Sequence, residues 1–263
     1  MNPTILYEDA NLAVLNKPAG LMVHGDGRSK EKTLTDWLLE KYPEIEKVGE
    51  PLKLVESQRS IRSKGQLEET KSETTLIYRP GIVHRLDKDT TGAIIIAKNQ
   101  ETFLFLKNQF KERTIIKNYH VFVYGKIKEM RGVIDRPIGR SNKDFRMWSA
   151  QRGARGDLRK AVTIYRVISQ NKDFTFVEAT PKTGRTHQIR VHFKAINHPV
   201  VCDKLYSPKK EAGLGFTRLA LHAFQIKFKN LEGKLIEVEA PYPADFKEAI
   251  KILDPVVDFG AAN

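Results

Sequence analysis

The sequence predicts an α+β fold with a mixed, mainly antiparallel sheet and flanking helices. Most segments with strand character follow one another directly along the chain, and few helical segments come between them. Neighbouring parallel strands need long crossover connections, so this order does not favour a doubly wound parallel sheet. The length of 263 residues is enough for one large domain with a sizeable core.

Two short strands open the chain at residues 4–9 and 12–20, because apolar runs flank an Asp-Ala-Asn turn. Residues 33–42 have helical spacing, with Thr33 or Thr35 as the cap, and the proline that follows ends this helix.

The later elements follow from the same criteria. The apolar run at 93–97 is typical of a buried strand, and residues 101–110 carry apolar side chains at helical spacing. Turn sequences at 171–173 and 232–233 separate strands. In chain order we predict strands at 93–97, 115–123, 162–168, 174–179, 219–229 and 235–239, and helices at 101–110, 187–195 and 245–253.

We expect one domain over residues 1–254 and a C-terminal tail over residues 255–263. A polar insertion near 56–76 has no clear period, and we interpret it as mobile. A basic insertion lies near 139–160.

The charge of the chain limits its partners. Lys and Arg number 45 against 32 Asp and Glu, a formal net charge of +13. A domain this basic attracts polyanions, most often nucleic acid. Charge alone does not separate RNA from DNA or from an anionic membrane, and a solvated basic surface without a partner stays an alternative.

Other classes of protein are disfavoured. The sequence has no apolar run of about 18 residues and no basic-then-apolar N-terminal segment, so we expect neither a membrane span nor a signal peptide. Cys202 is the single cysteine, which excludes an internal disulfide and a cysteine-based zinc site. A reducing, cytoplasmic setting fits this composition.

The most informative segment combines His84, Arg85, Asp87 and Asp89 between two glycines, immediately before the apolar run at 93–97. Carboxylates beside fixed cations at the edge of a core are what a polar reaction centre needs. An ordinary polar turn before a strand is the alternative interpretation. Sequence physics does not separate Asp87 from Asp89 as the reacting carboxylate.

A second segment, 117–125, alternates as a strand and carries Tyr119, which on its own is most simply a core tyrosine. A third segment combines Arg185, Arg190, His187 and His192 near the start of a helix, where anions are favoured. A solvated basic face is the alternative. The five-residue spacing of the two histidines does not favour a metal site.

Together these segments resemble the RluA-type pseudouridine synthases, whose signature is His-Arg-Leu-Asp-x-x-Thr-Ser-Gly. The chain departs from this signature once, with Thr91 in place of serine. The segments 16–24 and 219–223 resemble the opening and closing motifs of the family. The segment 201–207 departs from Gly-Asp-x-x-Tyr-Gly at both glycines, which puts the local loop shape in doubt.

The resemblance implies the pseudouridine synthase fold and the isomerisation of specific uridines in RNA to pseudouridine. It assigns Asp87 as the catalytic carboxylate, acting as nucleophile or as base, and Arg185 as its ion-pair partner. Tyr119 lines the pocket within reach of the carbon 5 proton, and Arg85 fills the place that the flipped base leaves. No metal or redox cofactor is implied. We expect the small RNA-binding domain of many relatives to be missing, because the resemblance already begins at Ile5.

The basic insertion near 139–160 has a net charge of +5, with seven cations against two carboxylates and with Phe145 and Trp148 among them. This composition suits phosphate contacts and base stacking, and a charged surface loop is the alternative. We expect the following RNA contacts: His84, Arg85, Arg140, Arg146 and Arg190.

The predicted partner is ribosomal or transfer RNA, with the uridine in a loop or stem-loop, and the predicted state is a monomer. An RNA-binding module without catalysis would share the charge but would not need the carboxylate, tyrosine and arginine together. A metal-dependent nuclease would need clustered acidic or histidine ligands, which the sequence does not show.

Overall fold

The computed structural model describes residues 2–25, 31–53, 76–77, 79–151 and 153–254. The predicted C-terminal tail and nearly all of the predicted polar insertion near 56–76 lie outside the described residues.

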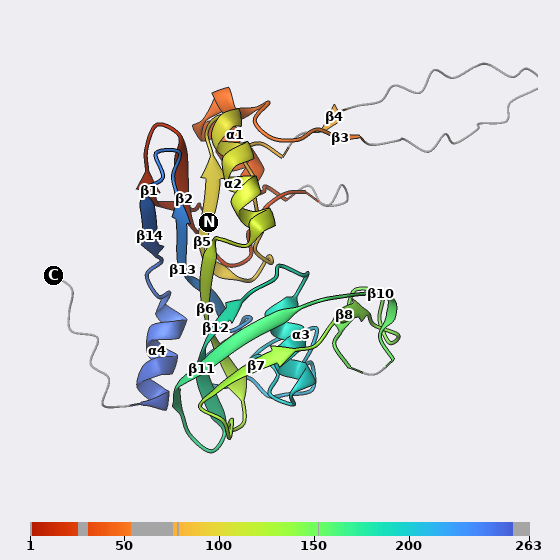
Figure 1. Ribbon diagram of the computed structural model, residues 1–263. Coiled ribbons are helices and arrows are strands. Elements are labelled where there is room, and N and C mark those ends of the chain that lie inside the picture. The colour runs from red at the N-terminus through yellow and green to blue at the C-terminus, as the bar shows by residue number, and fades with distance from the viewer. Residues whose placement is uncertain (1, 26–30, 54–75, 78, 152, 255–263) are drawn as a thin grey trace, which may run out of the picture.

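The described residues form one large mixed sheet (Figure 1). In spatial order its strands are β1 (Thr4–Glu8), β2 (Leu12–Lys17), β5 (Thr91–Ala97), β13 (Leu221–Lys229), β6 (Ile116–Tyr124), β12 (Phe174–Pro181), β11 (Val162–Gln170) and β7 (Arg131–Asp135), with β14 (Leu235–Glu239) paired to β13. Strand β13 runs parallel to β5, whereas the other strand pairs described in this sheet are antiparallel. The predicted fold class is therefore confirmed.

Four α-helices flank the sheet in the part of the chain that the structure describes. They are α1 (Leu34–Lys41), α2 (Gln100–Glu112), α3 (Gln188–Ala195) and α4 (Ala244–Leu253). In Figure 1, α1 and α2 lie beside the half of the sheet that contains β5, and α3 and α4 lie beside the other half. None of the described helices is long and apolar enough to cross a membrane.

The core follows this division. One apolar cluster packs α1 and α2 against β2 and β5, and its buried members include Leu15, Leu38 and Ile95. A second cluster packs α3 and α4 against β6 and β12, and includes Phe122 and Phe246. The continuous apolar run of β5 is buried at every position, as expected for a central strand.

Local sequence explains the helix ends. Thr33 caps α1 in a capping box with Asp36, and the helix stops before Pro43, as predicted. Asn99 caps α2 through the backbone N–H of Thr102, which adds one residue to the predicted start. Each cap satisfies backbone donors that have no partner within the helix.

Strands β7, β8, β9 and β10 were not predicted. Strand β7 is the edge strand beside β11, and β8 (Ile138–Arg140), β9 (Trp148–Ser149) and β10 (Arg155–Arg159) form a separate three-stranded sheet. All residues of β10 are exposed, so it has no buried face whose alternation could indicate a strand. The basic insertion is therefore an ordered small sheet that projects beside the main one (Figure 1).

Two glycines bracket the segment that carries the signature. Gly92 has φ +109°, and a Cβ there would lie 2.2 Å from the carbonyl oxygen of Ala223 on β13. Gly81 has φ +66°, and a Cβ there would lie 2.4 Å from the carbonyl oxygen of Ala97. Only glycine allows both the backbone conformation and these close approaches. The loop between them is consequently held at Gly92 against the parallel junction of β5 and β13, and at Gly81 against the other end of β5.

Candidate active site

A buried lysine, Lys17, binds the loop that contains Asp87. Lys17, at the end of β2, is 0% exposed, and its ammonium donates to the carbonyls of Pro18, Leu21 and Lys88 at 2.8, 2.8 and 2.9 Å. Burial lowers the pKa of Lys17 to about 7, and the charges of Asp89 and Asp87 oppose this shift. Pro18 and Leu21 follow β2 directly, whereas Lys88 lies in the loop that contains Asp87, so Lys17 ties that loop to the end of β2.

Sequence reasoning gave Lys17 no role, although the segment 16–24 was matched to a family motif. A lysine in sequence is normally an exposed residue, and nothing local indicates that backbone carbonyls from residues 18, 21 and 88 converge on it. The convergence of these carbonyls on Lys17 is a property of the tertiary fold and not of the local sequence.

Asp87 is paired with Arg190. The Nη1 of Arg190 donates to Asp87 Oδ2 at 2.9 Å, and the Asp87 side chain is 21% exposed. The rest of the guanidinium is bound to Asp203, with Nε to Oδ2 at 2.7 Å and Nη2 to Oδ1 at 2.8 Å. Arg190 therefore fixes the carboxylate of Asp87 from a position that is itself anchored on both sides.

The electrostatics of Arg190 agree with this geometry. Burial alone would lower the pKa of Arg190, but the hydrogen bonds and charge of Asp203, and then those of Asp87, outweigh burial and raise it. A permanent positive charge thus lies beside Asp87.

The predicted pair of Arg185 with Asp87 is wrong. Arg185 lies in the loop between β12 and α3, and its Nε donates to the backbone carbonyl of Lys160 at 3.1 Å. Arg190 lies in the first turn of α3, and its guanidinium reaches Asp87. Arg190 had been predicted as an RNA contact, but it is 9% exposed and engaged with two carboxylates, so we reassign it as a partner of Asp87.

The departure from the glycine pattern at 201–207 leaves the loop intact. Cys202 stands at the first glycine position and adopts φ 54°, the left-handed conformation that a glycine would take easily. Ser207 stands at the second, and its hydroxyl donates to the carbonyls of Val200 and Asp203. The buried Asp203 can therefore still accept from Arg190 and from the backbone of Leu205 at 3.0 Å.

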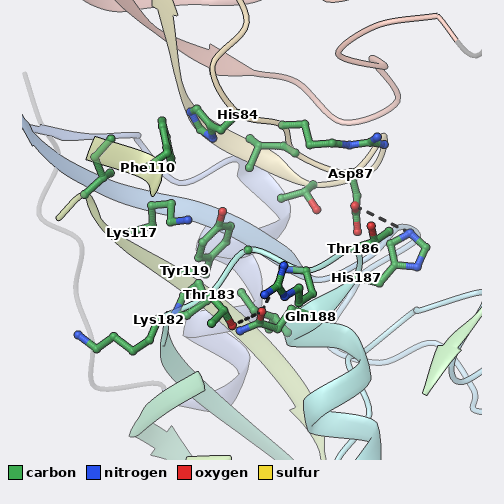
Figure 2. Close-up of a pocket in the computed structure, with 18 of the residues that line it drawn as sticks. His84, Asp87, Phe110, Lys117, Tyr119, Lys182, Thr183, Thr186, His187 and Gln188 are labelled. Carbon is green, nitrogen blue, oxygen red and sulfur yellow. Dashed lines mark hydrogen bonds and ion pairs between the residues drawn. The ribbon is translucent and has the colours of Figure 1, made fainter. Parts of the chain in front are cut away.

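Tyr119 lies on β6 and points into the same cleft as Asp87 (Figure 2). Burial, followed by the charge of Asp87, raises the pKa of Tyr119. The phenol is therefore neutral at neutral pH. The predicted convergence of Tyr119 and Asp87 on one cleft is confirmed, although they come from positions 32 residues apart in the sequence.

The cleft has a volume of about 490 Å³. It lies between the loop before β5, strand β6 and the segment that joins β12 to α3. Asp87 and His187 lie at one end and His84, Phe110 and Lys117 at the other, as Figure 2 shows. The other polar side chains at its wall include Arg85, Lys111, Arg113, Lys182, Thr183, Arg185 and Gln188.

His84 is packed rather than free to act as a cation. Its Nε2 accepts from the backbone N–H of Ile95 at 2.9 Å, and its ring stacks on Phe110 with centroids 4.8 Å apart. Burial, followed by the charge of Lys117, lowers the pKa of His84 to about 3. His84 is therefore neutral, so any contact with RNA would be through stacking or its second ring nitrogen and not through charge.

The remaining predicted RNA contacts lie in two places. Arg85 is exposed at the wall of the cleft. Arg140 and Arg146 belong to the small sheet and its connecting loop, with the Arg140 guanidinium 4.1 Å from the centroid of the Trp148 ring. Phe145, between them, is 80% exposed. Arg140, Phe145 and Arg146 are exposed and lie outside the cleft lining, whereas Arg85 belongs to it.

No group of three or more His, Cys, Asp or Glu side chains suited to a metal ion occurs within the described residues. His192 is buried, with its Nδ1 2.9 Å from the hydroxyl of Thr163 and its Nε2 3.0 Å from the carbonyl of Arg136. His187 lies at the cleft, apart from those partners.

The site combines a carboxylate fixed by arginine, a neutral tyrosine and a cleft with basic walls. This combination is typical of an enzyme that acts on a polyanion. A family model described as RNA pseudouridylate synthase matches residues 11–195. The chain therefore belongs to the RNA pseudouridylate synthase family, and it is an isomerase.

Several curated proteins are similar over most of the chain. An uncharacterized RNA pseudouridine synthase of Synechocystis is 36% identical over 95% of this chain and 68% of its own length. The YlyB protein of Bacillus subtilis, also an uncharacterized RNA pseudouridine synthase, is 36% identical over 96% and 73%. The ribosomal large subunit pseudouridine synthase D of Zymomonas mobilis is 33% identical over 95% and 72%.

Solved structures show the same fold. The human RNA pseudouridylate synthase domain containing 4 protein superimposes with a TM-score of 0.69 at 25% identity, over 95% of this chain and 92% of its own. The human domain containing 1 protein gives a TM-score of 0.66 at 25% identity, over 92% and 84%. The fold expected from the resemblance is thus confirmed.

Proposed function

We propose that this enzyme converts uridines of ribosomal RNA to pseudouridine and that Asp87 is its catalytic carboxylate. The observation that carries the role of Asp87 is its position in the cleft, with Arg190 on one oxygen at 2.9 Å. The choice of ribosomal over transfer RNA is supported by relatives named ribosomal large subunit pseudouridine synthase D from Zymomonas, Nitrosomonas and Haemophilus, which are 32–35% identical.

The first step is the entry of the target uridine. A base inside a helix or a structured loop must leave its stack to reach the cleft, at a cost of a few kcal/mol. A volume of about 490 Å³ is large enough for a nucleoside. Arg85 is exposed at the wall of the cleft and takes the place that the base leaves.

The second step breaks the bond between N1 of uracil and C1′ of the ribose. Asp87 acts there as nucleophile at the sugar or as base, and Arg190 fixes its rotamer for either role. The uracil then turns within the cleft, and a new bond joins its carbon 5 to C1′. If Asp87 is the nucleophile, its own bond to C1′ breaks as this bond forms; if Asp87 is the base, the proton that it took from the sugar returns to the sugar. The proton on carbon 5 leaves and N1 gains a proton, so the product is an isomer of the substrate.

Tyr119 takes part in the last step as a neutral hydroxyl. Burial makes its phenolate costly, so a standing phenolate base is disfavoured. The hydroxyl positions the freed uracil and accepts the carbon 5 proton only as it passes a proton on.

The remaining features belong to the same proposal. The enzyme acts as a monomer in the cytoplasm, without a cofactor, and residues 1–254 form one catalytic domain. The small sheet β8–β10 and its connecting loop supply RNA contacts through Arg140 and Arg146, since both are exposed and the guanidinium of Arg140 lies over the ring of Trp148.

The experiment that tests the substrate is a map of pseudouridines in total RNA from a strain that lacks this protein. The proposal predicts the loss of one or more pseudouridines from large-subunit ribosomal RNA, their return with the wild-type gene, and no return with Asp87→Asn. Loss confined to transfer RNA would contradict the ribosomal assignment.

A further inference from the structure

Tyr206 connects the small sheet to the cleft. It is 3% exposed and packs with Ile138 and Val191, between β8 and α3. Its hydroxyl oxygen accepts from the backbone N–H of Trp148, on β9, at 2.9 Å. The same hydroxyl lies 2.9 Å from Nδ1 of His187.

These two contacts determine which nitrogen of His187 carries the proton. A tyrosine hydroxyl has one proton to donate, and the Trp148 N–H occupies an acceptor position on the oxygen. Among the described residues, the remaining hydrogen-bond partner of this hydroxyl is His187 Nδ1. Tyr206 therefore donates to Nδ1, and the neutral imidazole carries its proton on Nε2.

The Nε2 of His187 faces the reaction centre. It lies 3.9 Å from Asp87 Oδ1, whereas Arg190 is bound to Oδ2 (Figure 2 shows the His187 contact). Burial lowers the pKa of His187, with the charge of Asp87 acting in the opposite direction, so the ring is neutral at neutral pH. The backbone of His187 is left-handed, with φ 56°, an uncommon conformation that persists where the surrounding structure holds it.

We propose that His187 is a positioning residue for Asp87, held by Tyr206 with its Nε2–H toward Oδ1. This inference deepens the proposed function and rests on the role of Asp87. At 3.9 Å the contact is longer than a hydrogen bond, and catalytic hydrogen bonds often tighten only in the substrate complex. When RNA fills the cleft, the contact shortens, and Asp87 is held by Arg190 on one oxygen and His187 on the other.

The same chain of contacts ties the small sheet to Asp87. Trp148 provides the backbone N–H that orients Tyr206, and its ring carries the guanidinium of Arg140 at 4.1 Å. RNA that contacts Arg140 therefore acts on the strand that fixes Tyr206 and, through it, His187. Correct docking of RNA on Arg140 and the orientation of the catalytic carboxylate are linked by four consecutive contacts.

A first experiment reads the tautomer directly, without substrate. In protein labelled with nitrogen-15 in histidine, the His187 signals are assigned as those absent from His187→Asn. The proposal predicts a protonated Nε2 and an unprotonated Nδ1, and a weaker preference in Tyr206→Phe. A proton on Nδ1 in the wild type would overturn the inference, whatever reaction the enzyme performs.

A second experiment compares two replacements of His187 by tritium release from RNA that contains 5-tritiated uridine. The amide N–H of His187→Gln can take the place of Nε2–H, whereas the shorter side chain of His187→Asn cannot. Asparagine tolerates a left-handed backbone well, so its variant is not penalised by strain. We expect His187→Asn to lower kcat by about 10- to 100-fold with KM nearly unchanged, and His187→Gln to recover most of that loss.

Thermal melting of both variants shows whether they fold like the wild type. Equal losses of kcat in the two folded variants, or losses confined to KM, would contradict a positioning role. Failure of the proposed function is a separate result, because it would appear as undiminished turnover in Asp87→Asn while the tautomer measurement stands on its own.

Discussion

Arg190 is bound on two sides by carboxylates, and its place in the molecule could not be deduced from the sequence. The segment from Arg185 to Arg190 contains two arginines, and both lie near the start of a helix. Which one turns toward Asp87 depends on where α3 begins and how it packs. The family resemblance predicted that Asp87, Tyr119 and the segment 185–190 meet at one site, and all three line the cleft. It assigned the ion pair with Asp87 to Arg185 and not to Arg190.

Replacing Arg190 should destabilise the protein strongly. Arg190→Met leaves the side chain of Asp203, which is 0% exposed, without its guanidinium partner. Removing one member of a buried pair costs about 3–5 kcal/mol of the free energy of unfolding. Urea denaturation measures this loss.

Arg185→Met is the matched control for that experiment. Arg185 makes one hydrogen bond to the backbone carbonyl of Lys160, so its replacement should cost less than about 1 kcal/mol. Equal destabilisation by the two replacements would contradict the assignment of Arg190 as the buried partner.

At the scale of elements, the terminus of β2 and the Asp87 loop are joined by Lys17. Lys17→Met would remove the ammonium donor from three carbonyls, of which the carbonyl of Lys88 keeps the backbone N–H of Gly20 at 3.0 Å. At about 1–3 kcal/mol for each of the other two, we expect a loss of at least about 2 kcal/mol of unfolding free energy. Lys88→Met is the control within the same loop, because its exposed ammonium contacts Glu31 at the surface and its backbone carbonyl remains. Urea denaturation measures both variants. A loss below about 1 kcal/mol in each would show that the hydrogen bonds of Lys17 contribute little to the free energy of unfolding.

The junction of β5 and β13 predicts a dependence of stability on pH. His222, which is 0% exposed, places its Nδ1 2.8 Å from the hydroxyl of Thr91 and its Nε2 3.2 Å from the carbonyl of Ala240. Burial lowers the pKa of His222 to about 4. An unfolded chain has a histidine pKa of about 6.5 and so binds more protons between these values.

The contribution of His222 to stability is therefore complete above about pH 6.5 and is lost as the pH falls toward 4, by up to about 1.4 kcal/mol per pH unit. Urea denaturation between about pH 5 and 7.5 measures the slope. His222→Gln, which retains an N–H for Ala240, should have a shallower slope. Parallel slopes for the two proteins would contradict the assignment.

The elements that the sequence predicted and those that it missed differ in burial. The runs at β5, β11 and β12 have buried faces, and their periods predicted strands close to the observed bounds. In β7 only Ile134 is buried, and β10 is exposed throughout. Such short charged strands are stabilised by pairing with a neighbour, which local sequence does not specify.

At the scale of the whole molecule, the net charge of +13 and the exposed small sheet predict strong salt dependence of RNA binding. The apparent affinity for RNA should fall steeply between about 50 and 300 mM salt. Arg140→Gln should lower the slope of log affinity against log salt by about one. Filter binding at a series of salt concentrations, or the salt dependence of KM, measures this slope.

Lys251→Gln is the matched control, since it removes one exposed charge from α4, which lies on the other side of the molecule from β8 and β10 (Figure 1). It should leave the slope nearly unchanged. An affinity that does not change with salt, or equal slopes for the two variants, would contradict the placement of RNA on the small sheet.

The whole account depends on one carboxylate in one cleft. Asp87 lines the cleft and is bound by Arg190, whereas Asp89, two residues further along the same loop, is exposed and outside the cleft lining. The most direct test is tritium release from 5-tritiated uridine in ribosomal RNA by the isosteric pair Asp87→Asn and Asp89→Asn. We predict that Asp87→Asn lowers turnover by at least about 1,000-fold and that Asp89→Asn stays within a few-fold of the wild type. Wild-type turnover in Asp87→Asn together with its loss in Asp89→Asn would contradict the account.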